Sequence, residues 1–178
     1  MKRRLVTQAP KADRAPIHKT VRGSASQFFI AGELCRRGAV AVVTMGNCPN
    51  TDILCSNTKG TRFAHIQVKT FRPGDKTCPV GEKAETEYGD NFFWILGGIP
   101  QSDSSHQFVY YVIPSPVMAR EIRRNHQKWL DTPGKRGQPH NPTNMRCIEL
   151  PPRLNHTGWS IEPFRNRWDL VLKCLGGL

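Results

Sequence analysis

Residues 51–70, TDILCSNTKGTRFAHIQVKT, predict a β-hairpin. Asp52 stands at the start of the first strand, and the polar residues 57–60 end in glycine, a composition that favours reversal of the chain. Side chains of a strand alternate between its two faces, so Gln67 and Lys69 share one face of the second strand. A carboxylate, a carboxamide and an ammonium therefore meet at the ends of two paired strands, and such a group can hold a divalent metal ion.

The composition favours a globular protein with a polyanionic partner. The 178 residues are enough for one domain with a real core. Lysine and arginine number 26 against 14 acidic residues, which gives a net charge of +12 and a pI of about 9.9. Such an excess most often serves binding to nucleic acid. The alternative is a basic tail on an otherwise ordinary protein.

Neither a membrane segment nor a secretory signal is expected. No apolar run approaches the roughly 20 residues of a membrane span, and no apolar core follows the charged N-terminal residues. The six cysteines include no CxxC pair, which argues against a zinc ribbon. Cys35 and Cys55 fall in apolar segments, where a reduced cysteine packs as a small hydrophobe. We therefore expect a cytoplasmic protein with free thiols.

The sequence predicts a flexible N-terminal arm followed by one folded domain. Residues 1–22 carry seven basic residues and Asp13 as their one acid, and they predict a flexible basic arm. This arm can clamp a phosphate backbone, or it can be a disordered start with no specific role. Residues 23–178 are expected to form a single domain.

The order of the predicted elements indicates the fold class. Apolar residues at helical spacing predict a helix over 24–37, with Ser24 as its cap and Gly38 as its stop. Beyond this helix we expect a buried strand at 39–44, the hairpin, a long exposed loop at 71–90, antiparallel strands at 91–99 and 106–113, a helix at 115–130, a short edge strand at 147–150 and a closing helix at 164–175. This order suggests an α/β fold with a mixed sheet flanked by helices. No dinucleotide-binding or P-loop motif is present.

The predicted helix at 115–130 and the loop that follows it are strongly basic. Ser115 and Pro116 favour a helix start, and Glu121 is the acid that opposes the basic residues of the helix. The loop at 131–142 is rich in glycine and proline, so it can be a rigid contact to nucleic acid or a plain surface crossover. The candidate nucleic-acid-binding residues are Arg120, Arg123, Arg124, Lys128, Lys135 and Arg136.

Three motif phrases, SQFFIAGELCRRG, TDILCSN and HIQVKT, resemble the PD-(D/E)xK nuclease superfamily. The resemblance covers roughly residues 24–70 and rests on Glu33 in the first helix, Asp52, and the Gln67-x-Lys69 pair. It implies a restriction-endonuclease-like fold and an endonuclease that cuts DNA with Mg²⁺ or Mn²⁺. Such folds often act as homodimers, so a second copy of the chain is an expected partner.

The resemblance also implies a role for each motif residue. Asp52, the Gln67 amide oxygen and the Val68 carbonyl would bind the metal. Lys69 would hold or deprotonate the attacking water, and Glu33 would hold a metal-bound water. Gln67 replaces an acidic residue, which removes a negative charge and should weaken metal binding. Similar QxK versions occur in Mrr-like restriction nucleases and in a group of intron-encoded homing endonucleases.

Each motif residue also has a simpler explanation. Asp52 can cap a turn, Gln67 and Lys69 can lie on a solvated strand face, and Glu33 can form a surface ion pair with Arg36 or Arg37. The glutamine at position 67 and the simpler explanation of Glu33 motivate a second hypothesis, in which the chain is a catalytically weak or inactive nucleic-acid-binding module on a nuclease fold. A basic structural protein with another acidic partner is the third alternative.

Overall fold

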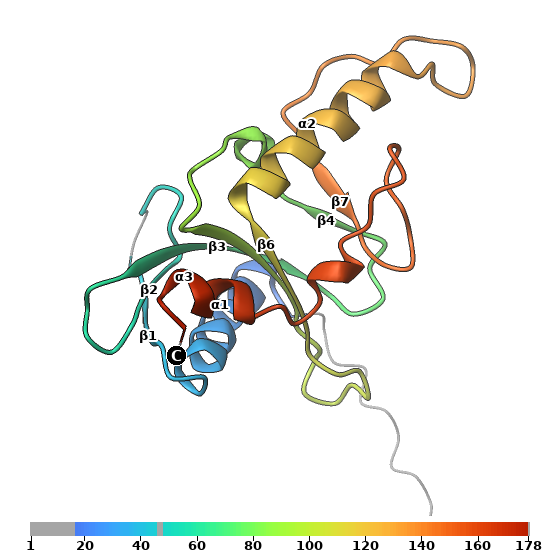
Figure 1. Ribbon diagram of the computed structural model, residues 1–178. Helices are drawn as coiled ribbons and strands as arrows, with labels where there is room; N and C mark the ends of the chain where they lie inside the picture. The colour runs from blue at the N-terminus through green and yellow to red at the C-terminus, as the bar shows by residue number, and fades with distance from the viewer. Residues whose placement is uncertain (1–16, 46–47, 178) are drawn as a thin grey trace, which may run out of the picture.

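Figure 1 shows the computed structural model, which describes residues 17–45 and 48–177. Five strands form a sheet in the order β1-β2-β3-β5-β6, and a two-stranded sheet pairs β4 with β7. Strands β3 and β5 run parallel and the other pairs are antiparallel, so the predicted mixed sheet is confirmed. The elements are α1 (Lys19–Cys35), β1 (Val40–Val43), β2 (Ile53–Ser56), β3 (Phe63–Phe71), β4 (Thr77–Pro79), η1 (Glu82–Glu85), β5 (Phe92–Gly98), β6 (Val109–Pro114), α2 (Ser115–Asp131), β7 (Cys147–Glu149), η2 (Glu162–Phe164) and α3 (Asp169–Cys174).

The sheet separates two hydrophobic cores. Helices α1 and α3 cover one face, where Ile30 and Leu34 of α1 pack on inward-facing residues of the strands. Helix α2, η1 and the small β4–β7 sheet cover the other face, where Trp94 and Met118 are fully buried. All seven residues of β5 are buried because the strand lies between covered faces. The predicted α/β fold with helices on both sides of a mixed sheet is therefore confirmed.

The predicted hairpin is present as strands β2 and β3. Ile53 pairs with Ile66 and Ser56 pairs with Phe63, so the strands are in antiparallel register. The turn is held by the side-chain oxygen of Asn57, which accepts a hydrogen bond from the Thr61 N–H at 2.9 Å. Local sequence chemistry therefore sets both the strands and their reversal.

Helix α1 begins earlier than predicted. His18 occupies the cap position, whereas Ser24 lies inside the helix and donates a hydrogen bond to the Thr20 carbonyl. Residues 19–22 of the predicted arm thus belong to α1, and residues 1–16 lie outside the described residues. Helix start signals such as serine are also common inside helices, where the hydroxyl bonds to the preceding turn.

Strand β1 lies at the edge of the sheet, so the prediction of a buried strand was wrong. Val40 is 44% exposed and Val42 is 58% exposed, while Ala41 and Val43 pack against the core below α1. An apolar run predicts a strand but not its place in the sheet, because the strand order depends on pairing between distant segments.

The prediction of an exposed loop at 71–90 was wrong, because Cys78, Val80 and Ala84 of this segment are buried in the core below α2. The segment 71–90 contains β4 and η1.

Helix α2 begins at Ser115 and extends away from the sheet (Figure 1). The closing helix α3 begins at Asp169, later than predicted, because Arg165 has an extended backbone and forms a β-bridge with Tyr111. The six cysteines are free thiols. Among residues 17–45 and 48–177, no helix is both long enough and apolar enough to span a membrane.

Candidate functional site

Asp52 lies immediately before β2. Its backbone continues the pairing of β2 with β1 on one side and with β3 on the other. Its N–H donates to the Ile66 carbonyl at 2.8 Å, and its carbonyl accepts from the Thr44 N–H at 2.9 Å. These bonds fix the residue between β1 and β3, so the side chain is directed across the hairpin. Asp52 is therefore part of the sheet framework and is more than the cap of a turn.

Three donors surround the Asp52 carboxylate. The Val68 N–H donates to Oδ2 at 2.6 Å, and the Gln67 side-chain amide donates to the same oxygen. The Gln27 amide of α1 donates to Oδ1 at 3.2 Å. The structure thus brings Asp52 and Gln67 together, as the motif predicts, and adds Gln27.

Burial raises the pKa of Asp52. The N–H of Val68, the positive charge of Lys69 and the amides of Gln27 and Gln67 act in the opposite direction, but desolvation outweighs them. The donors around this carboxylate therefore do not offset the free-energy cost of burying its negative charge. A cation at this position would supply the missing compensation.

Lys69 shares a face of β3 with Gln67, as the period-2 pattern predicts. His65, Gln67 and Lys69 are half-exposed, whereas the residues between them are buried. The Lys69 ammonium lies 5.7 Å from the centre of the Trp94 ring, on the neighbouring strand β5. Within the described part of the chain, Lys69 makes no ion pair with a carboxylate.

A hollow of about 550 Å³ opens beside these residues. Its lining is Cys48, Pro49, Asn50, Gln67, Lys69, Val80, Gly81 and Lys83, which includes two lysines and no carboxylate. The side-chain oxygen of Asn50 is buried and has no hydrogen-bond partner in the described structure. The hollow therefore offers an unused oxygen ligand and two positive charges next to Gln67.

Asp52, Asn50 and Gln67 carry oxygen atoms of the kind that Mg²⁺ binds in proteins. Asp52 supplies a carboxylate, Asn50 an unpartnered amide oxygen, and Gln67 can present its own amide oxygen after a half-turn of the amide group. No group of three His, Cys, Asp or Glu side chains with metal-binding geometry occurs among the described residues. A magnesium ion held by so few protein ligands would keep several waters, which is usual for Mg²⁺.

Glu33 does not join this group. Its carboxylate binds Arg36 at 2.8 Å and also Arg37, and these partners lower its pKa. Glu33 lies six residues after Gln27, which is about 240° further around an α-helix. It therefore borders a different hollow, near Tyr110 and Trp168, and the surface ion pair is the observed arrangement.

Gln27 is the site residue that the motif analysis missed. It precedes Ile30 by three residues and Leu34 by seven, so it belongs to the same helical stripe as these two core residues. The sequence did offer a signal for Gln27, namely a polar side chain at a position where the helical spacing predicts a core residue. Its amide reaches Asp52 because the stripe faces the sheet.

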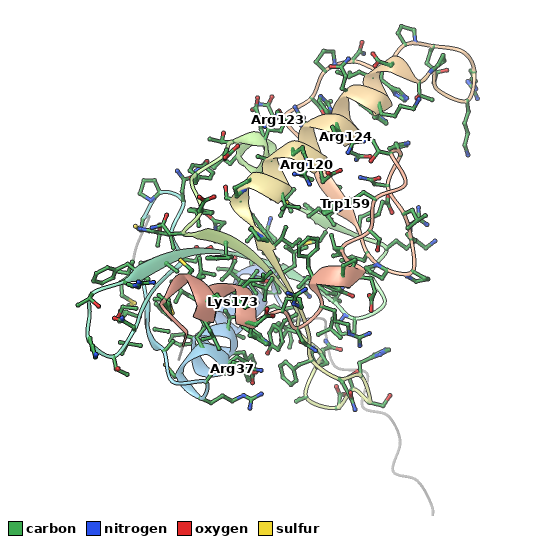
Figure 2. The ribbon with its side chains drawn as sticks, in the orientation of Figure 1. Arg37, Arg120, Arg123, Arg124, Trp159 and Lys173 are labelled. Carbon is green, nitrogen blue, oxygen red and sulfur yellow. The ribbon has the colours of Figure 1, made fainter. Side chains whose placement is uncertain are left out.

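The basic residues of α2 are partly neutralised by acids of the fold. Arg120 and Arg124 both pair with Glu121, whose side chain is 4% exposed, and Arg123 donates to the Glu85 carbonyl at 3.1 Å. Figure 2 shows these three arginines along α2. Lys128, Lys135 and Arg136 are exposed at the far end of the helix and in the following loop. A role of all six residues in binding nucleic acid stays a prediction.

Comparison with known proteins supports the fold. No family model and no curated protein sequence matches the chain. The structure of a bacterial homing endonuclease, I-Ssp6803I, matches with a TM-score of 0.51 and 14% identity, over 88% of this chain and 92% of that chain. The structure of Hjc, a Holliday junction resolvase from the archaeal hyperthermophile Archaeoglobus fulgidus, matches with a TM-score of 0.45 and 13% identity, over 88% of this chain and 97% of that chain.

The similarity to the homing endonuclease is a similarity of fold. The five-stranded mixed sheet and its flanking helices agree with the fold that the motif predicts. The chain therefore has a restriction-endonuclease-like fold.

Proposed function

We propose that this protein is a metal-dependent endonuclease that hydrolyses phosphodiester bonds in DNA. The observation that carries the proposal is the meeting of Asp52, Gln67 and Lys69 at one point of the sheet, beside a hollow with no acidic lining. The net charge of +12 favours a polyanionic substrate, and the similar homing endonuclease is itself a nuclease.

Asp52, Gln67 and Asn50 would hold Mg²⁺ or Mn²⁺ in this proposal, with the Val68 carbonyl as a further ligand. When bound, the ion supplies charge stabilisation for the phosphoryl group. The Gln27 amide orients Asp52 by bonding to Oδ1, which leaves the carboxylate plane fixed between α1 and β3.

Lys69 acts directly on the reacting groups. Its ammonium donates a hydrogen bond to a phosphate oxygen and balances the charge that builds up there. The attacking water forms the new P–O bond and releases a proton to the surrounding solvent, while the bond to the leaving oxygen breaks and that oxygen takes a proton from solvent. Lys69, whose ammonium lies 5.7 Å from the centre of the Trp94 ring, would also hold this water.

A plasmid-nicking assay tests the proposal. Supercoiled plasmid and a branched duplex are incubated with Mg²⁺ or Mn²⁺ and with wild type, Asp52→Ala or Lys69→Ala. Lys59→Ala is a matched control because Lys59 is an exposed lysine in the turn of the same hairpin, away from Asp52. Nicking by wild type and Lys59→Ala alone supports the proposal, and equal nicking by Asp52→Ala contradicts it.

A binding module without catalysis is the second candidate, and one observation favours it. The site contains one carboxylate, because glutamine stands at position 67 and Glu33 lies elsewhere. This candidate predicts salt-sensitive binding of DNA that responds neither to Mg²⁺ nor to Lys69→Ala. Binding that strengthens with Mg²⁺ in wild type but not in Asp52→Ala would exclude it.

A homodimer belongs to the same proposal. One chain offers one candidate site, so cutting both strands of a duplex in one encounter takes two copies. Sedimentation equilibrium of the free protein and of its DNA complex measures this stoichiometry.

A further inference from the structure

The hollow next to Gln67 contains a second lysine that the PD-(D/E)xK motif does not include. Lys69 of β3 and Lys83 of η1 both line it, and η1 belongs to the long segment that connects β3 to β5. None of the eight lining residues is acidic. In the described structure Lys83, like Lys69, makes no ion pair. The hollow thus carries two positive charges that no ion pair of the described residues neutralises.

The short helix that carries Lys83 is firmly anchored. Ala84 is fully buried in the core below α2. Glu85 forms an ion pair with Arg146, whose side chain is 8% exposed, and the Glu85 carbonyl accepts a bond from Arg123 at 3.1 Å. The backbone of Gly81 also donates to the Arg146 carbonyl at 3.2 Å. Lys83 therefore projects from a fixed base, although its own side chain is exposed.

The acids of η1 are directed away from the hollow. Glu85 is bound to Arg146, and neither Glu82 nor Glu85 lines the hollow. Both glutamates oppose the fall in the pKa of His126 that burial causes, which places them near α2. Successive residues of a 3-10 helix point about 120° apart, so Glu82 and Glu85 share one side and Lys83 takes another.

We propose that this hollow is a phosphate subsite, in which Lys83 binds a backbone phosphate of the polynucleotide next to the phosphate that Lys69 contacts. The substrate class rests on the proposed function. A lysine suits this role as a point charge with three donors, which tolerates different phosphate orientations. Lys83 is then a substrate-binding residue that sets the position of the strand at the metal-binding residues.

Binding measurements in EDTA test the subsite without relying on cleavage. The affinity for a fluorescent DNA duplex is measured over a series of salt concentrations for wild type, Lys83→Ala, Lys83→Arg and the control Lys59→Ala. Loss of one phosphate contact should reduce the slope of log K against log salt by about 0.9 in Lys83→Ala. Lys83→Arg should keep the wild-type slope, and so should Lys59→Ala. Thermal unfolding of each variant confirms that it is folded.

The results separate this subsite from the proposed catalytic function. A reduced slope in Lys83→Ala alone supports the subsite, whether or not the wild type cuts DNA. Equal slopes for Lys83→Ala and Lys59→Ala would overturn the subsite, even if plasmid nicking by the wild type were established. A wild type that does not bind the duplex would overturn it as well.

Discussion

The side-chain amide of Gln27 lies 3.2 Å from Oδ1 of Asp52 and links α1 to the end of the β2–β3 hairpin. The second oxygen of the same carboxylate accepts from the backbone of Val68. The carboxylate is thus held between a helix and a strand, each of which is fixed by its own core contacts. Its position depends on how closely α1 packs on the sheet.

Gln27→Ala should weaken both metal binding and cleavage. The substitution removes a donor that orients Asp52, and loss of such an orienting partner typically costs about 10- to 100-fold in affinity or activity. Gln27→Glu should instead tighten Mg²⁺ binding, because it adds a second carboxylate beside Asp52. Calorimetric titration of Mg²⁺ into wild type and both variants measures these changes. Unchanged affinity in both variants would show that Gln27 does not act on the site.

Glu33→Gln should leave cleavage unchanged and reduce stability. Its partners Arg36 and Arg37 lower the pKa of Glu33 in the folded protein, so the ion pairs stabilise the fold when the carboxyl is charged. The cost at pH 7 should be about 1 kcal/mol or less. It should disappear as the pH falls through the lowered pKa, because wild-type Glu33 is then protonated as well.

Denaturant unfolding of wild type and Glu33→Gln at pH 7 and at acidic pH checks this pH dependence, and plasmid nicking checks the activity. A large loss of cleavage in a stably folded Glu33→Gln variant would show that Glu33 takes part in catalysis. Arg36→Gln is the matched control, because it breaks one of the same ion pairs but keeps the Glu33 carboxylate.

The hairpin was predictable because its signals are local. Alternation of side chains and a polar turn ending in Gly60 determine two adjacent strands, and these place Gln67 and Lys69 on one face. The motif alone could not show that Gln27, and not Glu33, contacts Asp52. The motif favours the acidic residue, whereas the geometry of the helix decides which side chain reaches Asp52.

Lys83 could not have been assigned from the sequence. It lies in the segment 71–90, whose glycines, prolines and charges show no helix or strand period. Pairing of β4 with the distant strand β7 and packing of η1 on α2 bring it to the hollow. The edge position of β1 likewise depends on the order in which strands pair, and local propensity carries no information about that order.

Gly97→Ala should destabilise the protein by displacing α1. A Cβ at Gly97 would lie within van der Waals overlap of the Ser26 hydroxyl and close to Ile30. Overpacking of this kind typically costs about 1–3 kcal/mol. Ser26→Ala alone should be nearly neutral, since the buried hydroxyl has no partner in the described structure, and it should recover part of the loss in the double variant. A Gly97→Ala protein with wild-type stability in urea unfolding would contradict this close packing.

Asp52→Asn should raise the melting temperature of the metal-free protein at neutral pH while it abolishes the response to Mg²⁺. Burial raises the pKa of Asp52, so the charged carboxylate opposes folding, and this cost is present at high pH. The stability advantage of Asp52→Asn should therefore shrink as the pH falls through the raised pKa, where wild-type Asp52 becomes neutral. Magnesium at ten times its dissociation constant should stabilise the wild type by about 1.4 kcal/mol and leave Asp52→Asn unchanged. Thermal melts with EDTA or Mg²⁺, at neutral and acidic pH, measure both effects. Equal Mg²⁺ stabilisation of wild type and Asp52→Asn would show that the ion binds elsewhere.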